Sequence, residues 1–390
     1  MKNRLVRVAL GLAAALVLSA GLAQGASAHA KAHKHRGSAP RHIFVIMMEN
    51  HGTPEIIGNT SDAPFINKLV SRANVATNYF GVTHPSLPNY LSLFSGSFQG
   101  IWDDCKAGAD VMCAPEEFIP TSGDGTAGDY LSPAQIAAAS AIPHLFPGSN
   151  LVDQLEAQHL TWRAYMQSMP DVGSQVEYWP VIDTPTGPTT IKLYAQKHNP
   201  FMYFSDINYP GSPRLANIVP FAFRHFASDL RSRKLPNLVW ISPDECNDMH
   251  GISASTAALI GNPTCGFPDS GLDHGPIQLG DRFLKKTVKL ITHSRTWRKE
   301  PSSLVIVWDE DDYAGIDGCC GSPTGNGGVV LGGAHAPLIV LNSDGGGHST
   351  AVAANHYSLL ATIENLWHLG CIANTCAIGT SGQLDDLFGA

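Results

Sequence analysis

The chain has 390 residues, 44% of them hydrophobic, and its 25 lysines and arginines stand against 33 aspartates and glutamates, a formal net charge of −8 at pH 7. This length is ample for one large buried core. The acidic balance argues against broad binding to nucleic acids or anionic membranes, because a phosphate polyanion is repelled at long range. It does not exclude a small phosphorylated substrate, since local charge and a bound cation decide that contact.

The first thirty residues have the pattern of a secretory signal peptide. Three basic residues precede an apolar run from Val8 to Leu22, and small residues near position 28 offer a cleavage site. The run is short for a membrane span, and no later segment has the ~20 continuous apolar residues that a span needs. We therefore predict a secreted, extracellular protein without a stable membrane span; an uncleaved anchor is the alternative. Without the leader, 22 basic residues remain against 33 acidic ones, a net charge of −11.

Eight cysteines in an exported chain predict disulfides rather than redox or zinc centres. Two pairs are close in the sequence and are predicted to close local loops: Cys105 with Cys113, and Cys371 with Cys376. The other four leave three pairings open: Cys246, Cys265, Cys319 and Cys320. A zinc site built on thiolates is the alternative, but no CxxC pair supports it.

The order of apolar segments predicts an α/β fold. After a flexible arm over residues 31–40, a single domain is expected over residues 41–390. Strands are predicted at 42–48, 161–166, 236–243, 303–308 and 337–341. Helices are predicted at 64–73, 150–158, 218–230, 273–293 and 356–369, and residues 194–201 are expected to end a short helix and enter a loop. Strands alternating with helices indicate a three-layer α/β/α sandwich with a mostly parallel central sheet, and residues 98–148 form an insertion.

The stretch Thr83–Gly96, THPSLPNYLSLFSG, is the predicted reacting centre. A turn broken by proline presents Ser86 at the head of a helix, where free N–H groups and a partial positive charge suit a phosphate or sulfate oxygen. Thr83 is the rival nucleophile, because it is the other hydroxyl on this turn. The plainer alternative is a loop serine that caps the helix.

Acidic and amide side chains follow three of the predicted strands. They are Glu49 with Asn50, then Asp244 with Asp248 and His250, then Asp309 with Glu310. Ligands in open α/β sheets bind at the carboxyl ends of strands, and carboxylates grouped there raise one another's pKa unless a cation sits among them. Oxygen ligands favour Mg²⁺, Ca²⁺ or Mn²⁺, with Zn²⁺ a weaker candidate. A metal beside Ser86 would lower the pKa of its hydroxyl and offset the charge of a phosphoryl group.

As an ordered set, these segments resemble the phosphoesterase family of bacterial acid phosphatases and phospholipase C enzymes, within the alkaline-phosphatase-like superfamily. The matching pieces are the strand ending in Glu49-Asn50, THPSLPNYLSLFSG, YAQKHNP, DECNDMH, VWDEDD and NHYSLLATIENL, spread over roughly residues 40–370. The branch of secreted acid phosphatases that act on phosphatidylinositol 3-phosphate is the most similar. The sequence departs from the phospholipase C branch at ENHGTPEIIGN and in its cysteine-bearing insertions.

The resemblance implies a role for each matching residue. Ser86 takes the place of the nucleophile, and Asn89 that of an amide contacting phosphate. Asp248 and His250 would flank a second ion or the leaving group, with His250 first among the histidines that protonate it. The implied metal ligands are Glu49, Asn50, Asp309 and Glu310, and two further histidines fall at active-site positions that bind substrate: His335 and His356.

The sequence thus predicts a metal-dependent phosphomonoesterase that acts through a phosphoserine. Its substrate would be a phosphate monoester, with a phosphoinositide headgroup among the candidates, and its partners would not include nucleic acid. A phosphodiesterase of phospholipase C type would use the same site, because the loops at 98–148 and 312–334 decide which bond is cleaved. The remaining alternative is an exported binding protein without catalysis. The sequence leaves the oligomeric state open.

Overall fold

The computed structural model describes residues 39–113, 130–232, 235–312 and 315–389. These residues build an eight-stranded sheet in the order β13-β2-β12-β11-β1-β8-β4-β7. All pair in parallel except β12, which runs against both of its neighbours. In chain order the strands are β1 His42–Met48, β2 Asn74–Ala76, β4 Trp162–Gln167, β7 Ile218–Phe221, β8 Leu238–Ser242, β11 Ser302–Trp308, β12 Leu338–Asn342 and β13 Ser349–Thr350.

The central strands are apolar over most of their length because both faces of the sheet are covered. Every residue of β1, β8 and β11 is buried, as expected for parallel strands between two helical layers. β1 and β11 pair with Met48 opposite Trp308, so Glu49 and Asp309 leave the sheet at the same edge. The N–H of Asp309 donates to the carbonyl of Met48 at 3.0 Å, and that of Glu49 to the carbonyl of Asp248 at 2.9 Å.

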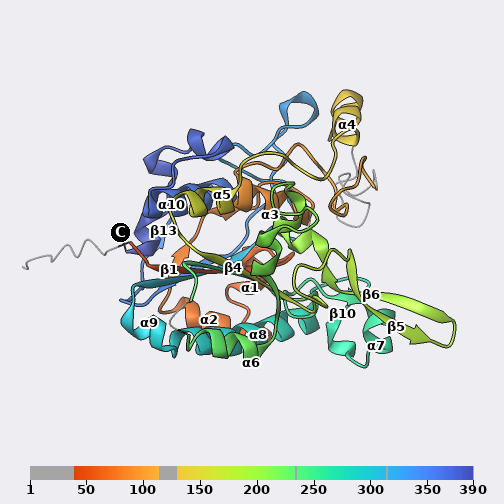
Figure 1. Cartoon of the computed structure of the whole chain (residues 1–390), viewed down its shortest axis with the longest axis horizontal. Coiled ribbons are helices and arrows are strands. Elements are labelled where there is room, and N and C mark those ends of the chain that lie inside the picture. Colours follow the sequence, from red (N-terminus) through yellow and green to blue (C-terminus); the bar gives the residue numbers. More distant parts are fainter. Residues whose placement is uncertain (1–38, 114–129, 233–234, 313–314, 390) are drawn as a thin grey trace, which may run out of the picture. The chain divides into compact units, whose positions relative to one another are not determined.

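Helices cover both faces of this sheet (Figure 1). On one side lie α3, α5 and α10, and on the other α2, α6, α8 and α9, which confirms the three-layer α/β/α prediction. The bounds are α2 Pro64–Val70, α3 Ser86–Ser95, α5 Leu151–Ala157, α6 Phe223–Asp229, α8 His274–Thr292, α9 Arg295–Lys299 and α10 His356–Trp367. The predicted helices at 64–73, 150–158, 273–293 and 356–369 are therefore confirmed to within a few residues.

Two predicted segments were wrong. Residues 218–230 begin with the edge strand β7 before α6; Pro220 is tolerated there because an edge strand has spare backbone groups. Residues 194–201 do not end a helix. They close the antiparallel hairpin of β5, Tyr178–Thr184, and β6, Gly187–Ala195, and then form short 3₁₀ turns. Covered and exposed residues alternate along this hairpin in the structure, but its sequence carries that alternation only weakly.

All eight cysteines form disulfides. The two local pairs, Cys105–Cys113 and Cys371–Cys376, are as predicted. The pairing that the sequence left open is Cys246–Cys265 together with the adjacent residues Cys319–Cys320. A zinc site on thiolates is therefore excluded.

Several sequence predictions fall outside the described residues. They are the leader, most of the arm at 31–40, and residues 114–129 of the insertion. The described parts of the insertion contain the Cys105–Cys113 disulfide and a helix, α4 Pro133–Ser140, capped by the Ser132 hydroxyl. Among the described helices, none combines the length and the apolar character that crossing a bilayer requires.

Gly81 follows the short strand β3 (Tyr79–Phe80). It packs against the backbone of Asp309, the residue after β11, and against the backbone of Gly333. A Cβ built on it would lie 2.7 Å from the carbonyl oxygen of Asp309 and 2.9 Å from Gly333. Gly81→Ala must therefore move backbone, and we expect it to lower the free energy of unfolding by about 1–3 kcal/mol and to reduce activity. Gly148→Ala is the matched control, because nothing lies within 4 Å of a Cβ built there. Equal urea midpoints for the two variants would contradict the expectation.

Candidate active site

Ser86 is the first residue of α3 and lies among carboxylates. It is 1% exposed, and its Oγ donates to Glu49 Oε2 at 2.8 Å. The same oxygen is 3.4 Å from Asn50 Oδ1 and 3.4 Å from Glu310 Oε1. Segments 37 and 224 residues away from Ser86 thus meet at one hydroxyl, as the sequence predicted.

The sheet edge delivers these partners. Glu49 and Asn50 follow β1, and Asp309 and Glu310 follow β11. Asn50 adopts a left-handed conformation, φ 45°, which asparagine tolerates better than most residues, and its N–H donates to Asp309 Oδ1 at 3.1 Å. Glu310 is held from the other side by His84, whose Nδ1 lies 2.7 Å from Glu310 Oε2.

The acidic side chains of the site carry opposing pKa shifts. Burial raises the pKa of Asp309 well above its usual range, and the charges of Glu49 and Glu310 add to that shift. Burial likewise raises the pKa of Glu310, with Glu49 and Asp104 contributing. Burial would also raise the pKa of Glu49, but the imidazolium of His198 overrides it and lowers the value to about 2. The site therefore holds more negative charge than its own cations balance.

His198 is a residue that the sequence predictions missed as part of the site. Its Nε2 lies 3.3 Å from Glu49 Oε1, and its Nδ1 lies 3.4 Å from Asp248 Oδ2. Burial disfavours its charge, yet the coulombic field of Glu49 raises the pKa well above the ordinary value. Tyr90 of α3 stacks on its ring with centroids 5.2 Å apart. The signal was present, because the residue stands within the quoted motif YAQKHNP.

His250 lies further from Ser86 than His198 does along this chain of contacts. The ring atom Nδ1 of His250 is 2.9 Å from Glu245 Oε2. The backbone N–H of His250 donates to Asp248 Oδ1 at 2.9 Å. Burial would lower the pKa of His250, but Glu245 raises it to about 9. Burial raises the pKa of Asp248 to about 7. Glu245 was a second residue that the sequence predictions did not include.

The amino end of α3 is joined to a buried lysine through Asp104. The N–H of Leu87 donates to Asp104 Oδ1 at 2.9 Å, and Lys197 Nζ donates to Asp104 Oδ2, also at 2.9 Å. One of the helix-end amides that the sequence suggested for a phosphate is thus taken by a carboxylate. The positive charge of Lys197 nevertheless acts on the acidic cluster, where it works to lower the pKa of Glu49 and of Glu310.

Asn89 and Thr83 shape the turn that carries Ser86. Asn89 Oδ1 accepts from the N–H groups of Val82 and Thr83 at 2.8 and 3.2 Å, and its Nδ2 donates to the carbonyl of Thr83 at 2.6 Å and to Glu310 Oε2 at 3.2 Å. This amide therefore positions the turn, and its predicted contact with phosphate stays a prediction. The Thr83 hydroxyl faces the carbonyl of His84 at 3.5 Å. Ser86 is the hydroxyl of this turn that contacts the carboxylates.

The two remaining predicted histidines lie at the margin of the site. His356 is fully buried, with Nδ1 2.8 Å from the Tyr79 hydroxyl and Nε2 2.6 Å from the carbonyl of Asp309. Burial lowers its pKa to about 4, so it is neutral and supports Asp309 from behind. The ring of His335 packs on Phe80 with centroids 4.1 Å apart. The structure does not bring His356 to the Ser86 side, and a contact of either histidine with substrate stays a prediction.

The cluster around Ser86 has the donor set for a hard divalent cation. Asp309 Oδ2 is buried without a hydrogen-bond partner among the described residues, and the buried oxygens Glu49 Oε1 and Asp248 Oδ2 face His198 at 3.3 and 3.4 Å. A buried carboxylate oxygen without a hydrogen bond costs folding free energy unless a positive charge compensates it. Oxygen ligands of this kind suit Mg²⁺, Ca²⁺ or Mn²⁺. Glu49, Asn50, Asp309 and Glu310 could hold the ion by drawing closer together.

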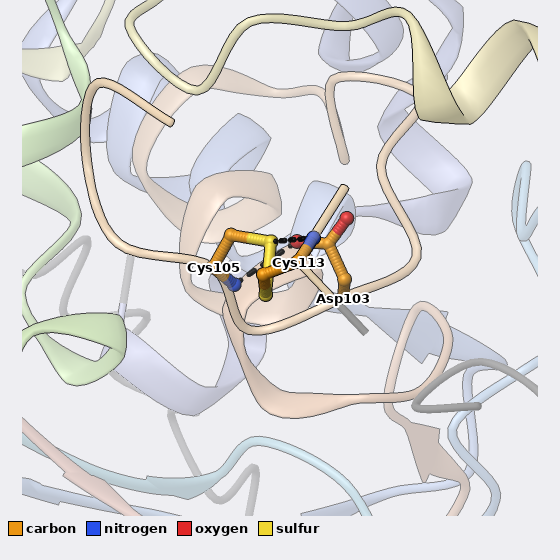
Figure 2. A group of neighbouring side chains, drawn as sticks. All are labelled: Asp103, Cys105 and Cys113. Carbon is orange, nitrogen blue, oxygen red and sulfur yellow. Dashed lines mark hydrogen bonds between the residues drawn. A yellow bond between two sulfur atoms is a disulfide. The ribbon is translucent and has the colours of Figure 1, made fainter. Parts of the chain in front are cut away.

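A tighter group of possible ligand atoms lies elsewhere but is not a metal site. Of the residues that the structure describes, Asp103, Cys105 and Cys113 are the trio whose donor atoms lie within 4.8 Å of one another. Figure 2 shows that the two sulfur atoms are bonded to each other, so they are not thiolates. Asp103 Oδ1 accepts from the N–H of Cys105 at 3.0 Å and lies 2.7 Å from His144 Nε2. This trio fastens the insertion.

Comparison with known proteins identifies the family. Residues 59–260, just over half of the chain, match the Phosphoesterase family. The chain belongs to this family. The matched region contains Ser86, Asn89, Asp248 and His250. Glu49, Asn50, Asp309 and Glu310 lie outside it, so their assignment depends on the geometry above.

Relatives of this Phosphoesterase family member carry phosphatase names. It is 27% identical to a phosphatidylinositol-3-phosphatase of Mycobacterium tuberculosis over 329 residues, 84% of this chain and 77% of the relative. It is 26% identical to a probable acid phosphatase of Kluyveromyces lactis over 337 residues, 86% of this chain but only 60% of that protein. The family and these names make the chain a hydrolase that acts on phosphoric ester bonds, as predicted.

Solved structures with a similar arrangement are more distant. A Vibrio parahaemolyticus protein in the alkaline phosphatase superfamily aligns with a TM-score of 0.46 at 11% identity, covering 90% of this chain and 70% of that one. The phosphonate monoester hydrolase of Agrobacterium radiobacter aligns with a TM-score of 0.45 at 12% identity, covering 90% and 77%. The family assignment depends on the sequence match and not on these structures.

Asn89 provides a test of how the turn is held. In Asn89→Ala the buried N–H groups of Val82 and Thr83 lose their acceptor, so we expect the free energy of unfolding to fall by about 2–3 kcal/mol. Activity should fall as well, because Ser86 is carried by this turn. Asn78→Ala is the control, since that side chain makes one long hydrogen bond, 3.4 Å, at the surface. Urea unfolding measures both variants. If Asn89→Ala lowers the free energy of unfolding no more than Asn78→Ala does, the turn is stable without the Asn89 side chain.

Proposed function

We propose that the chain is an exported, metal-dependent phosphomonoesterase, an acid phosphatase, that uses Ser86 as its nucleophile. The observation that carries the proposal is the placement of the Ser86 hydroxyl at the head of α3, 2.8 Å from Glu49 and 3.4 Å from Glu310. A serine amid buried carboxylates has no evident structural use there, whereas a hydroxyl to be deprotonated needs such neighbours. The relatives named as acid phosphatases support the reaction type.

Each residue then has a chemical task. Ser86 Oγ attacks phosphorus while the bond to the leaving alcohol breaks, and its proton passes to Glu310, 3.4 Å away, which is the more basic of the two neighbouring carboxylates. The leaving oxygen takes a proton from an imidazolium, His250 or His198, both of which the surrounding carboxylates keep protonated. Water then attacks the phosphoserine and gives its proton to the imidazole that protonated the leaving group, phosphate leaves, and Ser86 Oγ takes back the proton held by the neighbouring carboxylate. A divalent cation among Glu49, Asn50, Asp309 and Glu310 would lower the pKa of the hydroxyl and offset charge on the phosphoryl oxygens.

The substrate proposal follows one relative. The Mycobacterium tuberculosis protein is named a phosphatidylinositol-3-phosphatase, and we propose a phosphoinositide headgroup as one substrate of this chain. A phosphodiesterase reaction of phospholipase C type is the second candidate, because the same serine and carboxylates would serve it. Parallel assays on phosphatidylinositol 3-phosphate and on phosphatidylcholine separate the two, and faster cleavage of the diester would favour the second.

Removal of the nucleophile is the direct test. Ser86→Ala should lower turnover of an aryl phosphate at least about 10³-fold, with an unchanged melting temperature within a few degrees. Ser95→Ala, in the same helix and hydrogen-bonded to its sequence neighbours Leu91, Ser97 and Gln99, should keep wild-type activity. Thr83→Val tests the rival hydroxyl. If Ser86→Ala retained more than a tenth of the activity while Thr83→Val was inactive, the nucleophile would be Thr83.

Metal binding can be measured through thermal stability, without an activity assay. In chelator-treated protein, Mg²⁺, Mn²⁺ or Ca²⁺ at a hundred times its dissociation constant should stabilise the fold by about 2.7 kcal/mol. The double variant Asp309→Asn, Glu310→Gln should melt at a higher temperature than metal-free wild type, because it removes buried repulsion, and should gain nothing from the ion. Asp344→Asn, an exposed carboxylate, is the control. An equal metal response in the double variant would place the ion elsewhere.

A further inference from the structure

An open groove of about 630 Å³ lies on the helical layer formed by α6, α8 and α9. It is lined by Leu230 and Arg231, which follow α6, by the last two turns of α8, and by α9. These three helices lie on the same side of the sheet in Figure 1. The volume falls within the range of about 300–1,000 Å³ that small-molecule sites occupy, so the groove is large enough for a small ligand.

The groove lies near the amino end of β11, whereas the acidic residues of the candidate active site follow its carboxyl end. α9, whose Arg298 lines the groove, ends at Lys299, three positions before β11 begins at Ser302. β11 has seven residues, and at about 3.3 Å per residue its two ends are about 23 Å apart. A small ligand in the groove therefore lies apart from the carboxylates around Ser86.

Cationic side chains line this groove, and among its described lining residues there is no aspartate or glutamate. The five cations, all of them exposed, are Arg231, Lys286, Lys289, Arg295 and Arg298. The whole chain has 25 lysines and arginines against 33 aspartates and glutamates, so without these five the balance is 20 against 33. A fifth of the cations thus gather at one hollow of an acidic protein.

The positive charge of the groove is not balanced by acidic partners. None of the five cations forms an ion pair within the described part of the chain. Lys286 Nζ lies 3.5 Å from the centre of the Phe223 ring, and Arg298 donates to the carbonyl of His293. The carboxyl ends of α6 and α8 lie here and carry partial negative charge, but only about half an elementary charge each. Most of the positive charge therefore remains without an offset.

The spacing of the cations indicates which kind of anion fits. Lys286 and Lys289 are three positions apart on α8, and Arg295 begins the next helix. From Lys286 to the end of α8 the helix rises about 9 Å, so the positive charges are spread along the groove. Gathering them at a single phosphate would bring like charges together, whereas an anion with several phosphate groups can contact them in place. The acidic remainder of the chain disfavours an extended polyanion such as nucleic acid.

We propose that this groove is a second binding site, separate from the site at Ser86, for a compact anion that carries two or more phosphate groups. Guanidinium groups bind phosphate through paired hydrogen bonds, and Arg231, Arg295 and Arg298 provide them. Because no carboxylate is among the described lining residues to hold a metal or activate a nucleophile, the site binds its anion without cleaving it. The inference does not depend on the proposed phosphomonoesterase function.

Calorimetric titration with inorganic tripolyphosphate tests the site. The titration uses the full chain carrying Ser86→Ala, without added metal, so that the probe is neither cleaved nor chelated. Adding Lys289→Gln and Arg295→Gln should raise Kd at least about tenfold, because charge-assisted hydrogen bonds are lost. The matched control is Arg282→Gln with Lys285→Gln, which removes the same charge from exposed residues of α8 that do not line the groove. It should change Kd less than about twofold.

Three outcomes would overturn the proposal. If tripolyphosphate does not bind, or if the two pairs of substitutions weaken it equally, the groove is not a site, because an equal effect comes from net charge alone. If orthophosphate binds as tightly as tripolyphosphate, the ligand does not need several phosphate groups. Sedimentation with vesicles of phosphatidylcholine and phosphatidylglycerol tests a membrane instead. If the groove substitutions abolish vesicle binding and leave tripolyphosphate binding unchanged, the groove contacts a lipid surface and the proposal is wrong.

Discussion

The structure depends on an unfavourable arrangement, the burial of several carboxylates at one edge of the sheet. Glu49, Asp248, Asp309 and Glu310 are each fully buried or nearly so. Gathering like charges away from water raises their pKa values and costs folding free energy unless positive groups offset it. His198 and Lys197 supply part of the offset. The charge that remains without an offset is the reason to expect a cation at this edge of the sheet.

The parallel strands explain why those groups meet. β1 and β11 are adjacent and in register, so the residues that follow them emerge side by side. β8 pairs with the other side of β1, which brings the segment with Asp248 and His250 to the same edge. α3 then places Ser86 over this edge. The geometry of the sheet therefore assembles most of the site.

Much of the fold could be predicted from the sequence, because the positions of the strands follow from the local pattern of apolar and polar residues. Continuous apolar runs marked β1, β8 and β11, and the polar residues after them marked the site edge. The direction of β12 could not be read, since an apolar strand of five residues has the same pattern whether it runs parallel or antiparallel. The hairpin of β5 and β6 was missed because its alternation is weak and Pro180 and Pro188 interrupt it. β7 was mistaken for part of a helix, since its four residues continue into the amphipathic α6.

The site was less predictable than the fold, and the reason is long-range contact. Glu49, Ser86 and Glu310 could be grouped because each follows a recognisable segment. His198 could not be placed, because its role follows from packing between Tyr90 and the acidic residues. Asn89 was expected to meet the substrate, yet its amide is engaged by the backbone of the turn. Whether such a side chain is free for a ligand depends on partners that the sequence does not reveal.

The disulfide between the adjacent residues Cys319 and Cys320 has a thermodynamic consequence unlike that of the others. Cys246 and Cys265 are 19 positions apart, and closure of such a loop restricts the unfolded chain by about 3 kcal/mol in the entropic account. A bond between neighbours encloses no loop, so it leaves the random-coil ensemble almost untouched. Its effect is local: it closes a small ring around the one peptide unit between the two cysteines, near Asn355, whose amide donates to the carbonyl of Cys319. Reductive cleavage would thus alter local shape with little change in global melting.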